Sequence, residues 1–376
     1  MKKLTDICDI QYGYAFDSKC FTEDSSYPQL VRIRDVKKGY SETYYSGDYP
    51  EEYILSEGDL LVGMDGEFNI ARWKCSGALL NQRVCRLTAK VGTNEEYLRF
   101  AMSKSLKEIE QRTAFVTVKH LSAKELNKLE LDVPELSKQD KIADTLSRLE
   151  RVIEARKEEM EKLDDPIKAR FVEMFGDIAT GNYKYDTRKL GDVANVGSSH
   201  RVFTTEFVKK GIPFYRGTEI GELANGNKPA EPFYISEEHY NRLVYNDTKP
   251  QVGDLLLPSI CNKGQVWMVD TDEPFYYKDG RVLCISPDRE IFDTKYLECF
   301  MKAKTLVEYP KLGSGSTFAE FKIFLLKNID VLIPPRELQE QFSMFVKQVD
   351  KSKVAVQKAL DETQLLFDSL MQQYFE

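Results

Sequence analysis

The chain carries the stretch Gln139-Asp140-Lys141-Ile142-Ala143-Asp144-Thr145-Leu146 and returns to its pattern in Gln339-Glu340-Gln341-Phe342-Ser343-Met344-Phe345-Val346. The letters match weakly, but apolar residues recur at corresponding positions. In the first copy they are Ile142, Leu146, Leu149, Ile153, Met160, Leu163, Ile167 and Met174. In the second they are Phe342, Val346, Val349, Leu360, Phe367 and Tyr374, with Lys353 and Thr363 at the two remaining positions. Internal self-similarity of this kind predicts a duplicated fold.

Apolar steps of four and three predict that both stretches are long helices with a coiled-coil seam. Proline stands just before each of them, at Pro134 and at Pro334-Pro335, where a helix tolerates it. Pro166 falls inside the first stretch and predicts a kink or break near Asp165.

A symmetric pairing of the two helices would run antiparallel, with Ile142 near Tyr374 and Met174 near Phe342. Three cationic residues interrupt the seam, namely Arg156, Arg170 and Lys353. They either fix the register of the pair or extend their charged ends into solvent, and the sequence leaves both alternatives open.

The duplication continues outside the helices. Lys3-Leu4-Thr5-Asp6-Ile7 returns as Lys189-Leu190-Gly191-Asp192-Val193, Gly58-Asp59-Leu60-Leu61 as Gly253-Asp254-Leu255-Leu256, and Arg83-Val84-Cys85-Arg86-Leu87 as Arg281-Val282-Leu283-Cys284-Ile285. Apolar runs broken by turn residues predict strands at Gln29–Val36, Asp59–Gly63, Arg83–Thr88, Asp254–Pro258, Gln265–Asp270 and Arg281–Ser286. One helix is predicted in each copy, at Glu95–Glu110 and Thr294–Glu308.

These patterns predict an α+β fold with two mixed α/β domains, each followed by a long helix. The predicted domains are residues 1–138 and 179–338, and the predicted helices are residues 139–178 and 339–376. We expect the two helices to pair as an antiparallel coiled coil and to give the molecule pseudo-twofold symmetry.

The composition is typical of a soluble protein. Of the 376 residues, 42% are apolar and 30% are charged, and we expect neither a membrane span nor a signal peptide. The seven cysteines include no Cys-x-x-Cys pair, which favours reduced thiols and a cytoplasmic location. Cys85 and Cys284 lie in apolar runs and are predicted to be core residues.

The net charge of −8 argues against nucleic-acid binding only if the charge is spread evenly. It is not, because Arg32, Arg34, Lys37 and Lys38 cluster while much of the acid lies in the first long helix. The acidity nevertheless predicts that the isolated chain binds DNA weakly.

No catalytic motif is convincing. The sequence lacks the Gly-Lys-Ser/Thr ending of a phosphate loop and the Asn/Asp-Pro-Pro-aromatic motif of adenine methylation. Asp288 and Asp293, with Lys295, have the residue types of a metal nuclease, but their short spacing predicts a turn that leads into a helix. We therefore predict a recognition module without a catalytic or metal site.

Each long helix follows a strand end that closes in proline, Leu131-Asp132-Val133-Pro134 or Val331-Leu332-Ile333-Pro334, and the first ends in Arg170-Phe171-Val172-Glu173-Met174-Phe175-Gly176-Asp177. In this repeated order, the whole chain resembles the specificity subunit of type I restriction–modification enzymes. The resemblance implies two target recognition domains that each recognise half of a bipartite double-stranded DNA site. It implies a coiled-coil spacer that docks two modification subunits.

In that family, the modification subunits carry S-adenosylmethionine and methylate adenine. Restriction subunits join them to form a machine that uses ATP and Mg²⁺. The resemblance therefore implies no cofactor and no chemistry in this chain itself.

DNA phosphates and base edges are contacted mainly by Arg, Lys, Asn and Gln, from loops that follow strand ends. The candidates in the first half are Arg32, Arg34, Lys37, Asp65, Asn69, Arg72 and Lys119. Those in the second half are Arg201, Arg216, Asn262, Lys263, Lys311 and Ser316. Two alternatives stay open: a duplicated coiled-coil scaffold outside restriction, and a metal-dependent nuclease that uses Asp288 and Asp293.

Overall fold

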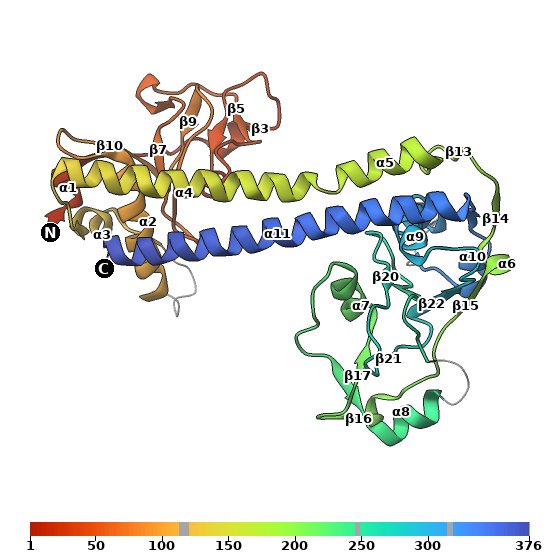
Figure 1. Ribbon diagram of the computed structural model, residues 1–376. Helices are drawn as coiled ribbons and strands as arrows, with labels where there is room; N and C mark the ends of the chain where they lie inside the picture. The colour runs from red at the N-terminus through yellow and green to blue at the C-terminus, as the bar shows by residue number, and fades with distance from the viewer. Residues whose placement is uncertain (113–119, 245–248, 314–318, 376) are drawn as a thin grey trace. The chain divides into compact units, whose positions relative to one another are not determined.

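The computed structural model describes residues 1–112, 120–244, 249–313 and 319–375 (Figure 1). The chain divides into two compact units, and each has its own hydrophobic core. Unit 1 consists of Met1–Glu159 and Val356–Glu376, and unit 2 consists of Met160–Ala355. No helix of the described residues is long and apolar enough to cross a membrane.

Unit 1 is built around an antiparallel sheet of four strands in the order β2-β10-β7-β8. Its strands are β2 (Cys8–Tyr12), β7 (Leu60–Gly63), β8 (Asn69–Arg72) and β10 (Val84–Ala89). Alternate side chains of a strand point to opposite faces. Cys85 and Leu87 of β10 therefore enter one core, with helix α2 (Glu95–Arg112), while Val84 enters another.

That second core includes side chains of a small sheet in the order β4-β9-β6, in which β4 and β9 are parallel. Its strands are β4 (Leu30–Val31), β6 (Ile54–Leu55) and β9 (Ala78–Leu80). The remaining elements are β1 (Lys2–Lys3), α1 (Leu4–Ile7), β3 (Phe21–Thr22), β5 (Tyr44–Tyr45), α3 (Ala123–Lys128) and β11 (Glu130–Leu131), with 3-10 turns η1 (Ser18–Cys20), η2 (Ile33–Asp35) and η3 (Glu51–Tyr53).

Unit 2 repeats this plan. Its main sheet has the order β15-β22-β19-β20, all antiparallel, which matches the order in unit 1. The strands are β15 (Ala194–Gly197), β19 (Leu255–Pro258), β20 (Trp267–Met268) and β22 (Val282–Pro287). Leu283 and Ile285 of β22 enter the core that contains helix α9 (Thr294–Glu308), while Val282 and Cys284 enter the core on the other face. The duplication predicted from the sequence thus extends to strand order.

The second sheet of unit 2 has the order β16-β18-β17-β21. Strands β17 and β21 are parallel, as β4 and β9 are in unit 1. Its strands are β16 (Phe207–Val208), β17 (Ile212–Tyr215), β18 (Phe233–Ile235) and β21 (Tyr276–Tyr277). The other elements are β12 (Gly176–Asp177), β13 (Asn182–Tyr183), β14 (Thr187–Lys189), α6 (Leu190–Val193), α7 (Gly217–Ala224), α8 (Glu237–Leu243), α10 (Ile323–Lys327) and β23 (Asp330–Leu332), with 3-10 turns η4 (Thr204–Glu206) and η6 (Tyr309–Leu312).

The long helices are α4 (Leu136–Lys162), α5 (Asp165–Phe175) and α11 (Arg336–Phe375). The predicted break near Asp165 is confirmed, because α4 ends at Lys162 and Pro166 lies in the first turn of α5. Proline is accepted there because the first N–H groups of a helix have no partner within it.

The antiparallel pairing of the helices is confirmed within each unit. In unit 1, Arg156 donates hydrogen bonds to the Ala359 carbonyl and to the Thr363 hydroxyl, while Tyr374 packs against the core that contains Ile142. In unit 2, Lys353 Nζ lies 2.5 Å from Asp164 Oδ1. The rings of Phe171 and Phe342 there lie 5.5 Å apart.

The three cations that interrupt the seam have different roles. Arg156 binds the facing helix α11, and Lys353 binds Asp164 in the break between α4 and α5. Arg170 pairs with Glu173 of its own helix at 2.8 Å. The predicted core positions of Cys85 and Cys284 are confirmed.

Two predicted strands are only partly correct. Of Gln265–Asp270, only Trp267–Met268 forms a strand. Of Gln29–Val36, only Leu30–Val31 does. The strand stops at Val31, since the Asp35 carboxylate accepts the Arg32 N–H at 3.1 Å and closes the turn η2.

Candidate nucleic-acid interface

In unit 1, candidate side chains gather where β7 ends and β10 begins. Val84 is paired with Gly63, and the Met64 N–H donates to the Arg83 carbonyl at 2.9 Å. We call this region, Met64–Asn69 with Arg83, the loop edge of unit 1. The structure brings two of the predicted residues, Asp65 and Asn69, together there.

The Asp65 carboxylate is nearly buried and holds two partners, Arg83 and His120. Burial raises the pKa of Asp65, but the hydrogen bonds from His120 and Arg83 outweigh burial and lower the pKa below its usual value. Asp65 is therefore an anion that orients Arg83. Arg83 has a φ of 70°, the only positive value at a non-glycine among the described residues, which costs about 1–2 kcal/mol.

The cationic turn of unit 1 lies beside this edge. A Cβ on Gly63 would come within 3.3 Å of Ile33 Cγ2, so the turn η2 packs directly on the end of β7. Lys37 Nζ reaches Glu67 Oε1 of the loop edge at 3.6 Å. Arg32 and Arg34 line an open pocket together with Phe21, Thr22, Glu23, Glu42, Thr43 and Tyr44. Among the described residues, the Arg32 guanidinium has no carboxylate or aromatic partner.

Arg72 lies apart from the other candidates. It is paired with Leu60, at the opposite end of β8 from Asn69. Its guanidinium binds Glu96, Glu95 at 3.0 Å and the Gly58 carbonyl at 2.6 Å, which fastens α2 to the sheet. Lys119 lies outside the described residues.

Unit 2 has a corresponding loop edge, Ser259–Gly264 with Arg281. Val282 is paired with Pro258, and the Ser259 N–H donates to the Arg281 carbonyl at 2.8 Å. The Gln265 side chain organises the candidates Asn262 and Lys263, since it accepts the Lys263 N–H at 2.9 Å and donates to Asn262 Oδ1 at 3.4 Å.

Arg83 and Arg281 occupy corresponding positions but bind carboxylates from different segments. Arg281 pairs with Glu320, which occupies the position in unit 2 that His120 occupies in unit 1. This correspondence follows because the Phe321 N–H donates to the Ser259 carbonyl at 2.8 Å, as the Leu121 N–H does to the Met64 carbonyl at 2.7 Å. The apolar runs predict both arginines only as strand residues. The signal was their recurrence at the start of the same repeated run.

Two further candidates lie beside the loop edge of unit 2. Arg201 Nε is 3.5 Å from Asp279 Oδ2, in the turn that precedes Arg281. Arg216 directly precedes α7, and a Cβ on Gly217 would come within 3.1 Å of the Pro258 side chain.

The last two candidates of the second half follow α9 in the chain. Lys311 lies on η6, is exposed, and pairs with Glu308 at 3.1 Å. The Tyr309 hydroxyl, on the same turn, donates to the Ala319 carbonyl at 2.8 Å. Ser316 lies outside the described residues.

Most of these cations have an acidic neighbour. The pairs are Lys37–Glu67, Arg83–Asp65, Arg201–Asp279, Arg216–Glu219, Arg281–Glu320 and Lys311–Glu308. Both side chains of the Lys37–Glu67 pair are exposed, and an exposed ion pair is worth only about 0–1 kcal/mol, so a phosphate can compete for Lys37. The carboxylates nevertheless reduce the positive potential that would attract DNA from a distance.

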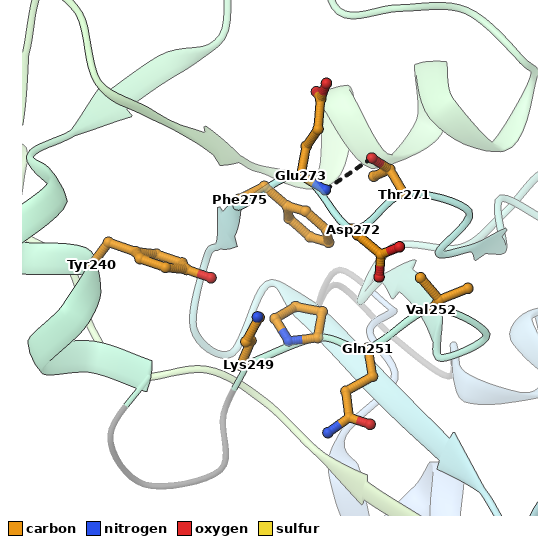
Figure 2. Close-up of a pocket in the computed structure, with 9 residues that line it drawn as sticks. Tyr240, Lys249, Gln251, Val252, Thr271, Asp272, Glu273 and Phe275 are labelled. Carbon is orange, nitrogen blue, oxygen red and sulfur yellow. Dashed lines mark hydrogen bonds between the residues drawn. The ribbon is translucent and has the colours of Figure 1, made fainter.

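The pocket of unit 2 in Figure 2 contains none of the predicted DNA contacts. It is lined by Tyr240, Lys249, Pro250, Gln251, Val252, Thr271, Asp272, Glu273 and Phe275. The two carboxylates of the nuclease alternative have structural partners. Asp288 accepts the Glu290 N–H at 2.9 Å, and Asp293 accepts the Tyr296 N–H at 3.1 Å at the start of α9. The predicted turn leading into a helix is thus confirmed.

Solved structures support the fold. An S subunit of a type I restriction–modification system from M. genitalium aligns over 100% of this chain and 95% of its own length, with a TM-score of 0.58 at 15% identity. A chain from a study of complex assembly and conformational transition of the type I R-M system aligns over 99% and 96%, with a TM-score of 0.59 at 18% identity.

Sequence relatives point the same way. The chain is 27% identical to the type I restriction enzyme EcoBI specificity subunit of Escherichia coli, over 99% of this chain and 84% of that protein. It is 24% identical to the MjaIX specificity subunit of Methanocaldococcus jannaschii, over 77% and 70%. The family model for the type I restriction modification DNA specificity domain matches residues 1–164 and 182–363. The chain therefore belongs to the specificity subunits of type I restriction–modification systems, the non-catalytic subunits that supply DNA specificity.

Proposed function

We propose that residues 1–138 and 179–338 are two target recognition domains, each of which recognises one half of a bipartite DNA site. One observation carries this proposal: the two loop edges share a backbone framework but differ in their side chains. The loop edge of unit 1 carries Asp65 and Asn69, whereas the loop edge of unit 2 carries Asn262 and Lys263. Loops that differ on a shared scaffold are what two different half-sites require.

The long helices, residues 139–178 and 339–376, serve in this proposal as the spacer and as the docking site for two modification subunits. Exposed apolar side chains on α11 support docking, among them Met344, Val354 and Leu365. Restriction subunits join the same assembly. S-adenosylmethionine, ATP and Mg²⁺ belong to these partners, and the assembly is expected in the cytoplasm.

The ion pairs at the loop edges bear on how DNA is held. Most of the candidate cations are paired with a carboxylate, which reduces what the isolated chain gains from binding a phosphate. We infer that tight binding requires the modification subunits to close around the duplex and add their own contacts.

Affinity purification of the tagged chain from its host tests the proposal against the scaffold alternative. An adenine methyltransferase should be recovered as the main partner. Val354→Asp should reduce its recovery, whereas Ser352→Asp, an exposed polar position nearby on α11, should not. Recovery of other proteins without a methyltransferase would favour the scaffold. Equal recovery of the methyltransferase by both variants would show that Val354 is not part of the docking site.

A further inference from the structure

The guanidinium of Arg216 is clamped along one side by Glu219. Arg216 Nε donates to Glu219 Oε2 at 3.2 Å and Nη2 donates to Oε1 at 2.6 Å. The backbone N–H of Arg216 donates to the same Oε2 at 2.8 Å. The carboxylate is 5% exposed, while the Arg216 side chain is 40% exposed. A buried anion thus fixes a cation that still faces solvent.

The same guanidinium also lies over an aromatic ring. Arg216 Cζ lies 4.5 Å from the centre of the Phe233 ring. Phe233 in turn stacks on Phe207, with ring centres 4.7 Å apart and planes at 17°. Strands β18 and β16, which carry these rings, are paired in the second sheet of unit 2. Cation–π contact with Phe233 therefore restrains the guanidinium in addition to its two hydrogen bonds to Glu219.

Among the described residues, Glu219 is the hydrogen-bond partner of this guanidinium, and the end edge of the fork has none. A guanidinium has five N–H donors in a rigid fork. Glu219 takes the N–H of Nε and the adjacent N–H of Nη2, so the end edge keeps one N–H on each Nη, parallel to each other. Two parallel donors match the O6 and N7 acceptors of guanine in the major groove, and ordering them in advance lowers the entropy lost on binding.

We propose that Arg216 recognises one guanine of the second half-site through the end edge of its guanidinium, with Glu219 as the positioning residue. This inference rests on the proposed function, in which residues 179–338 recognise one half of the DNA site, because it assigns one base of that half to Arg216. It goes beyond that function by naming the base and the group that reads it.

The corresponding arginine of unit 1 lacks this support. Arg32 precedes η2 as Arg216 precedes α7, but the acid three residues on is Asp35, one methylene shorter than Glu219. The Asp35 carboxylate is engaged by the Arg32 N–H at 3.1 Å and by the Ser41 hydroxyl at 2.8 Å. Among the described residues the Arg32 guanidinium has no carboxylate partner that fixes its orientation. We expect it to bind a phosphate and to add no base preference.

The test is selection of bound duplexes from a randomised library by the chain assembled with its modification subunits. Wild type should select a split motif with one guanine in the second half-site. Arg216→Lys keeps the charge but cannot form the fork, and should lower that preference by about 5- to 150-fold. Glu219→Gln should also lower the preference for guanine. Arg242→Lys, an exposed arginine on α8, is the matched control and should leave the motif unchanged.

Preference at the first half-site serves as the internal check that each variant is folded. Arg216→Lys with an intact motif, or with equal losses at every position, would overturn the guanine contact. Glu219→Gln with an intact motif, beside an altered Arg216→Lys, would overturn the role of Glu219. A wild-type assembly that selects no split motif would overturn the proposed function itself, which is a different result.

Discussion

Gln139 and Gln339 make the same hydrogen bonds in the two units. Gln139 accepts the Asn94 N–H at 2.8 Å and donates to the Pro134 and Gly92 carbonyls at 2.8 and 3.2 Å. Gln339 accepts the Asp293 N–H at 2.9 Å and donates to the Pro334 and Ile291 carbonyls at 2.8 and 3.0 Å. Both side chains are fully buried. The junction between each sheet region and its long helix is thus duplicated down to single hydrogen bonds.

Replacing either glutamine should loosen its own unit. Gln139→Leu leaves three backbone groups without partners, and we expect a loss of about 2–4 kcal/mol in the free energy of unfolding. Hydrogen exchange followed by mass spectrometry should show faster exchange in unit 1 for Gln139→Leu and in unit 2 for Gln339→Leu. Gln348→Leu, exposed on α11, is the control and should change exchange little. Equal effects on both units from a single variant would contradict independent cores.

Phe342 should anchor the start of α11. It is fully buried, and its ring centre lies 5.5 Å from those of Phe171 and Phe175. Phe342→Ala leaves a cavity, so the free energy of unfolding should fall by about 3–5 kcal/mol in urea titrations. Met344→Ala, 62% exposed two residues further on, should change it by less than about 0.5 kcal/mol. Similar losses for both variants would refute this packing.

Assembly should control affinity for DNA. Because Arg83 and Arg281 of the loop edges are paired with carboxylates, we expect the isolated chain to bind its target with a Kd of about 1 μM or weaker. The assembly with modification subunits should reach about 10 nM or tighter. Fluorescence anisotropy across a salt series measures both. A sequence-specific, salt-resistant complex of the isolated chain would contradict the inference.

Arg281 should bind a phosphate beside the second half-site. Arg281→Ala removes one cation, so binding by the assembly should weaken for all sequences and the salt slope should fall by roughly 1. Arg83→Ala, at the corresponding position of unit 1, should weaken binding and reduce the salt slope in the same way. Arg188→Ala, exposed on β14, is the control and should leave the slope unchanged. An altered base preference instead of a uniform loss would reassign Arg281 to base recognition.

The repeated runs predicted the strands and helices well because each run carries its own local signal. Glu95–Glu110 and Thr294–Glu308 became α2 and α9 almost residue for residue. The strand predicted to run to Val36 ends at Val31, since the Asp35 carboxylate accepts the Arg32 N–H and this hydrogen bond competes with strand pairing.

The candidate site was less predictable because its contacts join distant segments. Nothing near Arg72 in the sequence shows that Glu95 and Glu96 fold back onto it. Hydrophobic periodicity likewise does not predict that Arg83 pairs with Asp65 or that Arg281 pairs with Glu320. What the sequence did carry was the recurrence of arginine at the start of both central strands.

We propose that this chain alone sets the DNA sequence that its partners modify. Sequencing the adenine methylation of the host genome, with and without the gene for this chain, tests it most directly. We expect one split adenine motif that disappears on deletion and returns when the chain is restored. A methylome unchanged by deletion, in cells whose modification subunits are present and active, would contradict it.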